Sequence, residues 1–401
     1  MSKPSVLISG AGIAGPVCAH FLARAGIKTT IVERSPSLRR AGQQIDIRGA
    51  GLTVVQHMNL EATIRSKTTK EAGLAFVDSR GRPFATFPVD EKGGRSFTSD
   101  VEIVRGELAQ IVYDASKETT EYVFGDHVTR WVEREEKIEV EFASGGKGEF
   151  DMLLGADGMG SKIRRLAFPD EQALRPLGQY TSFFTVPYEE SDGRYAQWYN
   201  APGGRCILLR PDHEGNTRVY LSIMSPSPAG YYTLSIDEQK QMMHGFFADA
   251  GWEAARVLRG MDRADDFYMQ EIAQIKMRRW SQGRVGLLGD AGYCPSPISG
   301  MGTSLALIGA YVLAGEIARC GMDHHEAFRR YQQRMHPYVE KAQRLLPGAP
   351  ALLNPQTRWG IAAMKGILGL ASWSRVATVV GKLSRPPAED QSLPVYDFVP
   401  T

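Results

Sequence analysis

The sequence predicts an α/β protein, in which a parallel, nucleotide-binding sheet carries an inserted and mostly antiparallel sheet. Apolar runs at residues 6–8, 150–154 and 285–288 each lead into a glycine-containing turn, as buried strands of parallel sheets do. Residues 180–224 are instead rich in β-formers with alternating faces, which is typical of antiparallel strands with one buried side. Together these patterns favour two closely packed lobes over one continuous sheet.

The chain begins with the most informative stretch, residues 6–33. An apolar strand, a glycine turn, a helical pattern and a second strand follow one another and end on Glu33. This is the context of the dinucleotide-binding fingerprint. Gly10 permits the tight turn, Gly12 lets the backbone approach a pyrophosphate, and Gly15 lets helix and strand pack closely. The free N–H groups of the helix would face the phosphates, and Glu33 would accept hydrogen bonds from a ribose. The alternative is a helix–strand turn that binds no nucleotide.

Composition excludes several other classes of protein. The 401 residues contain 47 Lys and Arg against 45 Asp and Glu, so a net charge of +2 favours neither nucleic acid nor an acidic partner. Apolar residues make up 43% of the chain, yet no uninterrupted run reaches the roughly 18 residues of a membrane span. The cysteines form no C-x-x-C pair, so we expect no metal, no disulfide and a reducing, cytoplasmic location; they are Cys18, Cys206, Cys294 and Cys320.

The remaining elements follow from periodicity and turn residues. Before residue 150 we expect strands or hairpins at 42–49, 76–87, 101–105, 123–132 and 138–142, with helices at 51–60 and 106–116. After the β-rich region we expect helices at 235–260, 303–320, 328–345 and 355–383. The 355–383 segment is strongly apolar, and we expect it to pack over the groove between the two lobes rather than to anchor the protein to a membrane.

Two later strands end beside an acid, at Asp157-Gly158 and at Gly289-Asp290. Ligands of open α/β sheets gather at the carboxyl ends of the strands, where an acid can hold the hydroxyls of a long cofactor. Either Asp could instead be an ordinary helix cap. Their placement together with the first fingerprint favours the cofactor interpretation.

At this point the chain resembles a known family, the class A FAD-dependent monooxygenases built like p-hydroxybenzoate hydroxylase. The resemblance lies in GAGIAG at 10–15, GADGMGSKIR at 155–164 and GDAGYCPSPISGMG at 289–302, and is nearest to the tetracycline-degrading and fungal-type branches. It implies a Rossmann-type GR2 FAD-binding fold with an inserted, mostly antiparallel substrate sheet and C-terminal helices. The implied segments are 1–175 and 276–345 for the FAD-binding domain, 176–275 for the substrate domain, and 346–401 for the C-terminal helix and tail.

The resemblance also implies which residues bind the cofactor. Glu33 and Arg34 would hold the adenosine end, Arg105 the flavin region and Asp290 the ribityl chain, while the 297–302 backbone would lie against the flavin ring. The complete set of implied cofactor-binding residues is Gly10, Gly12, Ala14, Gly15, Glu33, Arg34, Asp46, Arg105, Asp157, Arg164, Asp290, Pro297, Gly300, Met301 and Gly302.

This chain departs from the family pattern at three places. Tyr293 stands where His is common, Thr303 where Asn is common, and Gly309 where Asp is common. Asp290 and the glycines are retained, so the departures concern the mobility of the flavin ring and substrate access beside Tyr293 rather than flavin binding.

The implied reaction is the insertion of one oxygen atom from O2 into an aromatic or polyketide-like small molecule. NADPH or NADH would reduce FAD, and oxygen would add to give a flavin C4a-hydroperoxide. Because the cofactor carries out this chemistry, we assign no catalytic side chain. The predicted substrate-binding residues lie in the β-rich region and are Phe183, Trp198, Tyr199 and Arg210.

Two other functions are compatible with such a fold. A flavin-dependent dehydrogenase or reductase would oxidise NAD(P)H without placing oxygen in a product; a flavin halogenase is disfavoured because the sequence lacks W-x-W-x-I-P. A non-catalytic binding protein, as the Rab GDP-dissociation inhibitors are, would use the fold without flavin. The yellow colour of bound flavin would distinguish the second possibility from an enzyme.

Overall fold

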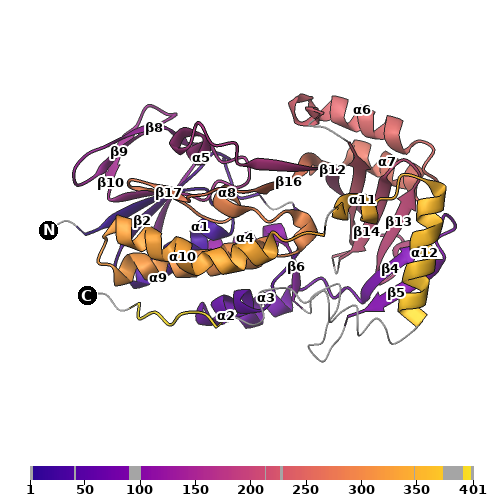
Figure 1. Cartoon of the computed structure of the whole chain (residues 1–401), viewed down its shortest axis with the longest axis horizontal. Coiled ribbons are helices and arrows are strands. Elements are labelled where there is room, and N and C mark those ends of the chain that lie inside the picture. The colour runs from indigo at the N-terminus through magenta and orange to yellow at the C-terminus, as the bar shows by residue number, and fades with distance from the viewer. Residues whose placement is uncertain are drawn as a thin grey trace.

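The computed structural model describes residues 3–39, 42–89, 101–212, 214–225, 229–346, 348–373 and 392–398. It contains two lobes that lie side by side along the long axis of the molecule (Figure 1). The predicted α/β fold is confirmed: one lobe is built on a mainly parallel sheet and the other on a mainly antiparallel sheet.

The first lobe is organised around a six-stranded sheet in the order β17-β18-β11-β1-β2-β7. Its strands are β1 Ser5–Ser9, β2 Lys28–Glu33, β7 Thr120–Phe124, β11 Met152–Gly155, β17 Ser281–Gln282 and β18 Val285–Leu287. All neighbours pair in parallel except β17 with β18. The carboxyl ends of β1, β11 and β18 therefore open toward the same edge, as the three motifs predict.

Helices bury the apolar strands of this sheet. The main ones are α1 Ala14–Arg24, α4 Arg105–Asp114, α9 Gly302–Arg319 and α10 His324–Ala342. Val17, Phe21 and Leu22 lie on the inner face of α1 and are fully buried, as their helical spacing predicts. The helix α9 packs against both α1 and α10, so it lies at the centre of the helical layer.

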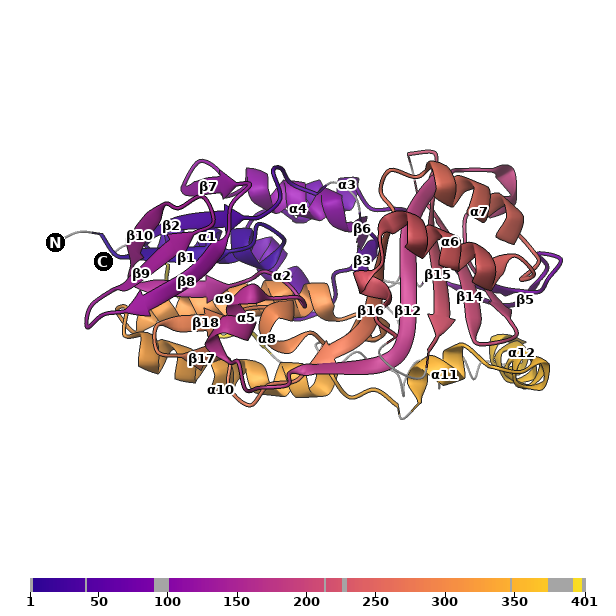
Figure 2. The same ribbon diagram turned by 90° about the horizontal axis from the view of Figure 1, so that it is seen from above.

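The second lobe contains a seven-stranded sheet in the order β16-β12-β15-β14-β13-β4-β5. The strands are β4 Gly73–Val77, β5 Pro83–Pro88, β12 Leu174–Pro187, β13 Ala196–Ala201, β14 Arg205–Pro211, β15 Asn216–Met224 and β16 Tyr268–Ile275. The long strands β12 and β16 run from the first lobe into the second (Figure 2). The β4–β5 hairpin lies before residue 176 in the sequence but joins this sheet through the parallel pair β4–β13.

One face of the second sheet is covered by two helices, α6 Ile236–Phe247 and α7 Ala254–Arg263, where the periodicity predicted a single helix over 235–260. The backbone breaks the helix because Gly251 and Trp252 have positive φ angles of 77° and 50°. The strand predicted at 123–132 is likewise divided into β7 and β8, with Gly125 at a φ of 77° between them.

Shorter elements complete the lobes. They are β3 Gln44–Asp46, β6 Glu102–Val104, β8 Val128–Glu133, β9 Ile138–Phe142, β10 Lys147–Phe150, α2 Ala50–His57, α3 Glu61–Ser66, α5 Lys162–Ala167, α8 Asp290–Tyr293, η1 Glu190–Asp192, η2 Tyr231–Thr233 and η3 Pro297–Ser299. The small β3–β6 ladder lies between the lobes and brings residues 44–46 next to 102–104.

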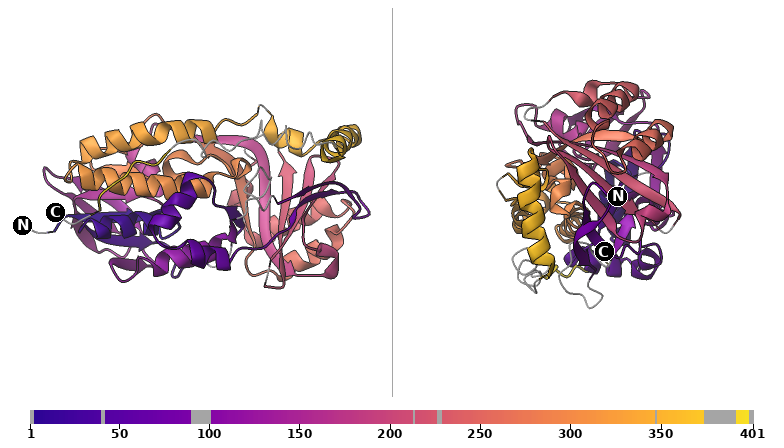
Figure 3. Two further views of the ribbon diagram at one scale, coloured as in Figure 1. Left: turned by 90° about the horizontal axis from the view of Figure 1, so that it is seen from below. Right: turned by 90° about the vertical axis from the view of Figure 1, so that its right-hand side faces the viewer.

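The C-terminal helices α10, α11 Ala349–Leu353 and α12 Arg358–Trp373 follow one side of the molecule (Figure 3). The expectation that residues 355–383 cover the groove between the lobes is wrong for α12, because this helix packs on β5 and β13 at the outer part of the second sheet. Positions 374–383 of the predicted helix lie outside the described residues. Tyr396 and Phe398 pack on Phe21 and Tyr311 of the first lobe. Among the described residues, no helix is long and apolar enough to cross a membrane.

Candidate active site

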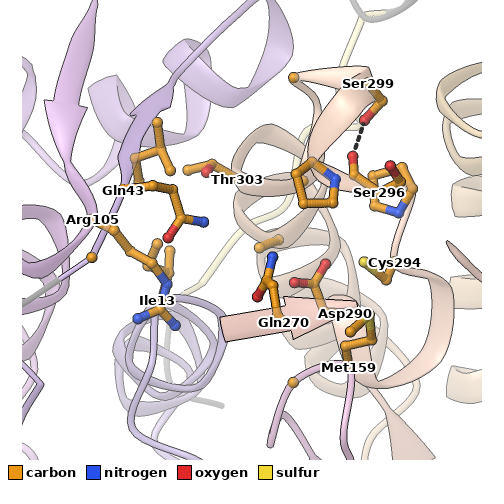
Figure 4. A pocket seen from close by; sticks show the side chains of 18 of the residues that line it. Ile13, Gln43, Arg105, Met159, Gln270, Asp290, Cys294, Ser296, Ser299 and Thr303 are labelled. Atoms are coloured by element: carbon orange, nitrogen blue, oxygen red, sulfur yellow. Dashed lines mark hydrogen bonds between the residues drawn. The ribbon is translucent and has the colours of Figure 1, made fainter. Parts of the chain in front are cut away.

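A cavity of about 2980 Å³ extends between the lobes, from the first glycine turn to the second sheet. Its walls come from the β1–α1 turn, β3, the start of α4, the ends of β11 and β18, the 294–303 loop, and β12–β16. Side chains from both lobes face this space, including Arg105 and Gln43 on one side and Asp290, Cys294 and Gln270 on the other (Figure 4). The cavity thus joins the three sequence motifs to the substrate sheet.

The end of the cavity at the first glycine turn has the geometry of a pyrophosphate cradle. Gly10 has a φ of 115°, and a Cβ there would stand 2.5 Å from the Ala156 carbonyl oxygen. A Cβ at Gly15 would overlap the Gly10 carbonyl oxygen, whereas one at Gly12 would meet only Arg105 Nη2 at 3.5 Å. Gly15 therefore serves packing, does not line the cavity, and leaves the open approach to Gly12. No side chain caps α1, so its first N–H groups remain for an anion.

The Glu33 carboxylate is held in place by the backbone around it. Its two oxygens accept hydrogen bonds of 2.9 Å from Ala11 N and Ser35 N. The residue still lines the cavity together with Arg34, at the end where an adenosine would extend from the pyrophosphate. A carboxylate fixed by two amides can accept ribose hydroxyls without first losing side-chain freedom.

At the opposite end of the cofactor region, Asp290 lies on α8 beside the start of α9. Its side chain opens into the cavity but is surrounded by protein, and this burial raises its pKa. No side-chain cap is present on α9, so Asp290 is not the cap of that helix. The 297–302 turn completes this wall; Pro297, Gly300, Met301 and Gly302 all line the cavity.

The middle motif is used differently from the other two. Asp157 lines the cavity, but its carboxylate accepts hydrogen bonds from Lys162 N at 2.7 Å and from Ser161 Oγ at 2.5 Å. It therefore stabilises the start of α5, as the capping alternative predicted. Arg164 is buried and absent from the cavity lining; its guanidinium donates to Met159 O and Ala291 O, which joins the middle motif to the Asp290 segment.

Arg105 and Asp46 lie on the wall that faces Asp290. Arg105 points into the cavity beside Ile13, where an incoming cofactor would pass (Figure 4). Asp46 forms a 3.1 Å ion pair with Arg48, and its carboxylate lies 3.7 Å from where a Gly300 Cβ would stand. Both residues thus contact the region predicted for the flavin.

Of the four predicted substrate-binding residues, Phe183, Trp198 and Arg210 line the cavity. Tyr199 does not. Its side chain lies on the opposite face of β13, where the hydroxyl donates to Ala250 O at 2.6 Å and the ring packs against Trp252. Phe183 belongs to an aromatic group on the cavity side of the sheet, with ring centroids 4.9 Å from both Tyr220 and Tyr268.

Arg210 is the centre of a buried cluster that sequence reasoning missed. Its guanidinium donates to Glu71 Oε1 at 3.2 Å and Oε2 at 2.7 Å, and it is also paired with Glu102. Burial, together with the nearby negative charge of Glu71 and Asp46, raises the pKa of Glu102 well above 4.5, although Arg210 opposes the shift. The cluster adjoins the cavity through Arg210 and through Tyr220, whose hydroxyl accepts the Gln44 N–H at 2.9 Å.

This cluster predicts a pH effect on stability. A carboxyl with a raised pKa binds its proton more tightly in the folded state, so stability is lost as pH rises above about 4.5 toward the folded pKa. We expect Glu102→Gln to reduce this loss, because the amide has no proton to release. The check is the urea-unfolding free energy of both proteins between pH 5 and pH 8. Equal slopes in the two proteins would contradict the raised pKa.

The two departures at residues 293 and 309 meet in the structure. The Tyr293 side chain is fully buried, and its hydroxyl lies 2.7 Å from the Tyr331 hydroxyl. A Cβ at Gly309 would overlap the Tyr293 hydroxyl oxygen, and Trp280 packs on the ring at 4.6 Å. Tyr293 therefore lies behind the cavity wall and not in the cavity lining.

These features fit FAD, which is long enough to need every part of the cradle. Gly12 leaves room for a pyrophosphate, the uncapped α1 supplies donors, Glu33 suits a ribose, and Asp290 suits the hydroxyls of a ribityl chain. When bound, FAD would supply the redox chemistry between a reduced nicotinamide, oxygen and the substrate.

Comparison with known proteins agrees with this assignment. Residues 3–345 match the family described as FAD binding domain. The chain is 34% identical over 414 residues to an FAD-dependent monooxygenase of Sarocladium schorii, with 98% of this chain and 97% of the relative covered. It is 36% identical to a flavin-dependent monooxygenase of a Phoma species, over 99% and 98% of the two chains.

Solved structures give the same result. The tetracycline destructase Tet(51) superposes with a TM-score of 0.81 at 29% identity, over 99% of this chain and 100% of that one. HpxO of Klebsiella pneumoniae, solved with FAD and uric acid, has a TM-score of 0.77 at 21% identity over 96% and 97%, which supports the fold alone. The chain therefore belongs to the FAD binding domain family and is a class A FAD-dependent monooxygenase.

Proposed function

We propose that this enzyme uses NADPH or NADH and O2 to hydroxylate an aromatic or polyketide-like substrate. The observation that carries the proposal is the continuity of one cavity from the Asp290 and 297–302 wall to the apolar and aromatic face of the second sheet. A multi-ring substrate could therefore lie against that sheet while its reacting carbon meets the flavin. The name of the solved relative, a tetracycline destructase, supports a substrate of this size.

The residues of this chain would act by holding and enclosing the substrate. Phe183 and Trp198 offer flat apolar surfaces for a ring, and Arg210 lies at the polar end of the same wall. Because Glu71 and Glu102 already bind its guanidinium, Arg210 would present a fixed dipolar edge and not a free cation. The enclosing walls would also keep water from the reacting atoms.

The overall reaction balances as NAD(P)H, a proton, O2 and a C–H substrate giving NAD(P)⁺, a hydroxylated product and water. One oxygen atom enters the product and the other leaves as water. The oxygen-transfer step by the route that the family resemblance implies is part of this proposal.

The test combines stopped-flow spectroscopy with isotope labelling. Purified yellow enzyme is mixed anaerobically with NADPH or NADH, alone and with a panel of phenols and polyketides, and flavin bleaching is recorded. We expect at least one panel member to accelerate reduction and to carry one ¹⁸O atom after turnover under ¹⁸O2. Rapid reduction with hydrogen peroxide formation and no labelled product across the panel would favour the dehydrogenase or reductase alternative.

A pair of variants locates the substrate. Trp198→Ala should raise the substrate concentration needed for half-maximal stimulation of reduction by about tenfold, since an aromatic contact is worth about 1 kcal/mol or more. Tyr199→Phe, one residue away on the other face of β13, should leave that concentration unchanged. Equal effects of the two changes would move the substrate away from this wall.

A further inference from the structure

The helix α12 carries an apolar stripe on the side that faces away from the protein. Residues 359, 363, 367 and 370 recur at helical spacing and are all solvent-exposed. Trp359 is 87% exposed and Ile367 is 69% exposed, values far above those of a packed helix. An exposed tryptophan and isoleucine on one stripe indicate an interaction surface, not an ordinary solvated face.

The inner face of α12 already accounts for the packing of this helix. Leu368 packs with Phe76, Phe87 and Trp198 in a small apolar cluster, and Lys365 Nζ lies 5.1 Å above the Phe84 ring. Ser372 Oγ also donates to Thr86 O on the neighbouring strand. Folding of the second lobe therefore explains one side of α12 and leaves the outer stripe without a structural purpose.

The exposed apolar surface continues toward the cavity. Leu352 on α11 is 63% exposed, and Leu346 just before that helix is 75% exposed. Both lie on the side of the molecule along which α10, α11 and α12 are aligned (Figure 3). Leu346 also lines the active-site cavity, as does Leu353. The apolar surface formed by Leu346, Leu352, Trp359 and Ile367, called the apolar rim below, therefore adjoins an opening of the cavity.

The charge of this segment identifies the kind of partner. The sequence contains no Asp or Glu between Glu340 and Glu389, although the whole chain is nearly neutral. The same segment contains only basic charges, at Lys341, Arg344, Arg358, Lys365, Arg375, Lys382 and Arg385. Arg358 is exposed next to Trp359 at the start of α12. Cationic charge beside exposed Trp, Leu and Ile side chains is complementary to an anionic lipid surface.

We infer that the apolar rim docks the enzyme reversibly on the surface of an anionic lipid bilayer. Trp359, Ile367 and Leu352 enter the boundary between headgroups and acyl chains, while Arg358 meets the phosphate layer. The helix lies in the plane of the membrane and does not cross it. Docking in this orientation brings the cavity opening at Leu346 to the lipid surface, from which a lipophilic substrate can enter.

The test is vesicle flotation of the full-length protein with its bound FAD. Phosphatidylcholine vesicles with and without 30% phosphatidylglycerol, chosen as the anionic probe, are floated at low salt and at 0.5 M salt. We expect the protein to float with the anionic vesicles, less at high salt, and to show quenching of tryptophan fluorescence by brominated lipid. The double variant Trp359→Ser, Ile367→Ser should reduce the bound fraction at least tenfold and remove part of the quenching.

Ile236→Ser on α6 is the matched control, because Ile236 is also exposed, at 55%, but lies outside the rim. This variant should float like the unaltered protein, and unchanged melting temperatures and flavin spectra will show that all variants are folded. Failure of the protein to float with either vesicle would overturn the inference, as would flotation unaffected by the double variant. A dimer in light scattering that the double variant converts to monomer, without flotation, would assign the rim to a second copy instead.

Discussion

Replacing Asp290 by alanine should strip the enzyme of FAD while leaving a folded apoprotein. Asp290 opens into the cavity, and no hydrogen bond from its side chain caps α8 or α9. Loss of hydrogen bonds from a charged group to the cofactor costs about 1.5–3 kcal/mol, or roughly a 10- to 100-fold weaker affinity. The measurement is a titration of the apoprotein with FAD, followed by flavin fluorescence.

Asp157→Ala provides the opposite comparison at the neighbouring strand end. Since this carboxylate binds the first turn of α5, its loss should lower the unfolding free energy by about 1 kcal/mol, with a smaller change in flavin affinity. Full flavin occupancy in Asp290→Ala, or identical behaviour of the two variants, would show that the two acids are not divided between cofactor and helix.

The second large effect is expected at Arg210. Changing it to methionine leaves Glu71 and Glu102 buried without their cation, and breaking a buried ion pair on one side costs about 3–5 kcal/mol. The loss should be greatest at high pH, because at lower pH the carboxyls can take up protons. Urea unfolding at pH 6 and pH 8 gives the size and the pH dependence of the effect.

Arg82→Met is the control for this change. Arg82 also pairs with a carboxylate, Asp78, at 2.8 Å, but its side chain is 67% exposed, so its removal should cost less than about 1 kcal/mol. Comparable losses from Arg82→Met and Arg210→Met would mean that the buried cluster has no special role in stability.

The cofactor region could be predicted from sequence because its constraints are local. Gly10, Gly12 and Gly15 lie within one turn of backbone, and each is required by a contact or an approach within that turn. The sequence could not show that Asp157 binds α5 while Asp290 faces the cavity, since both follow a buried strand in the same way.

The substrate region was harder to predict because its contacts are remote in sequence. Arg210 meets partners that are 139 and 108 residues away, at Glu71 and Glu102, and no local pattern joins them. Trp198 and Tyr199 show a second reason. Neighbouring side chains on a strand face opposite ways, so only one can line the cavity, and the alternation does not say which face is the inner one.

The contact between Tyr293 and Gly309 means that these two positions can change only in a particular order. A carboxylate at 309, the common residue there, has no room while the tyrosine hydroxyl occupies that volume. Shortening Tyr293 must come first, and that step alone leaves a buried hole beside Trp280 and an unpaired hydroxyl on Tyr331. Every single-step path back to the common pair therefore passes through a less stable protein, which would keep a lineage with Tyr and Gly on its own branch.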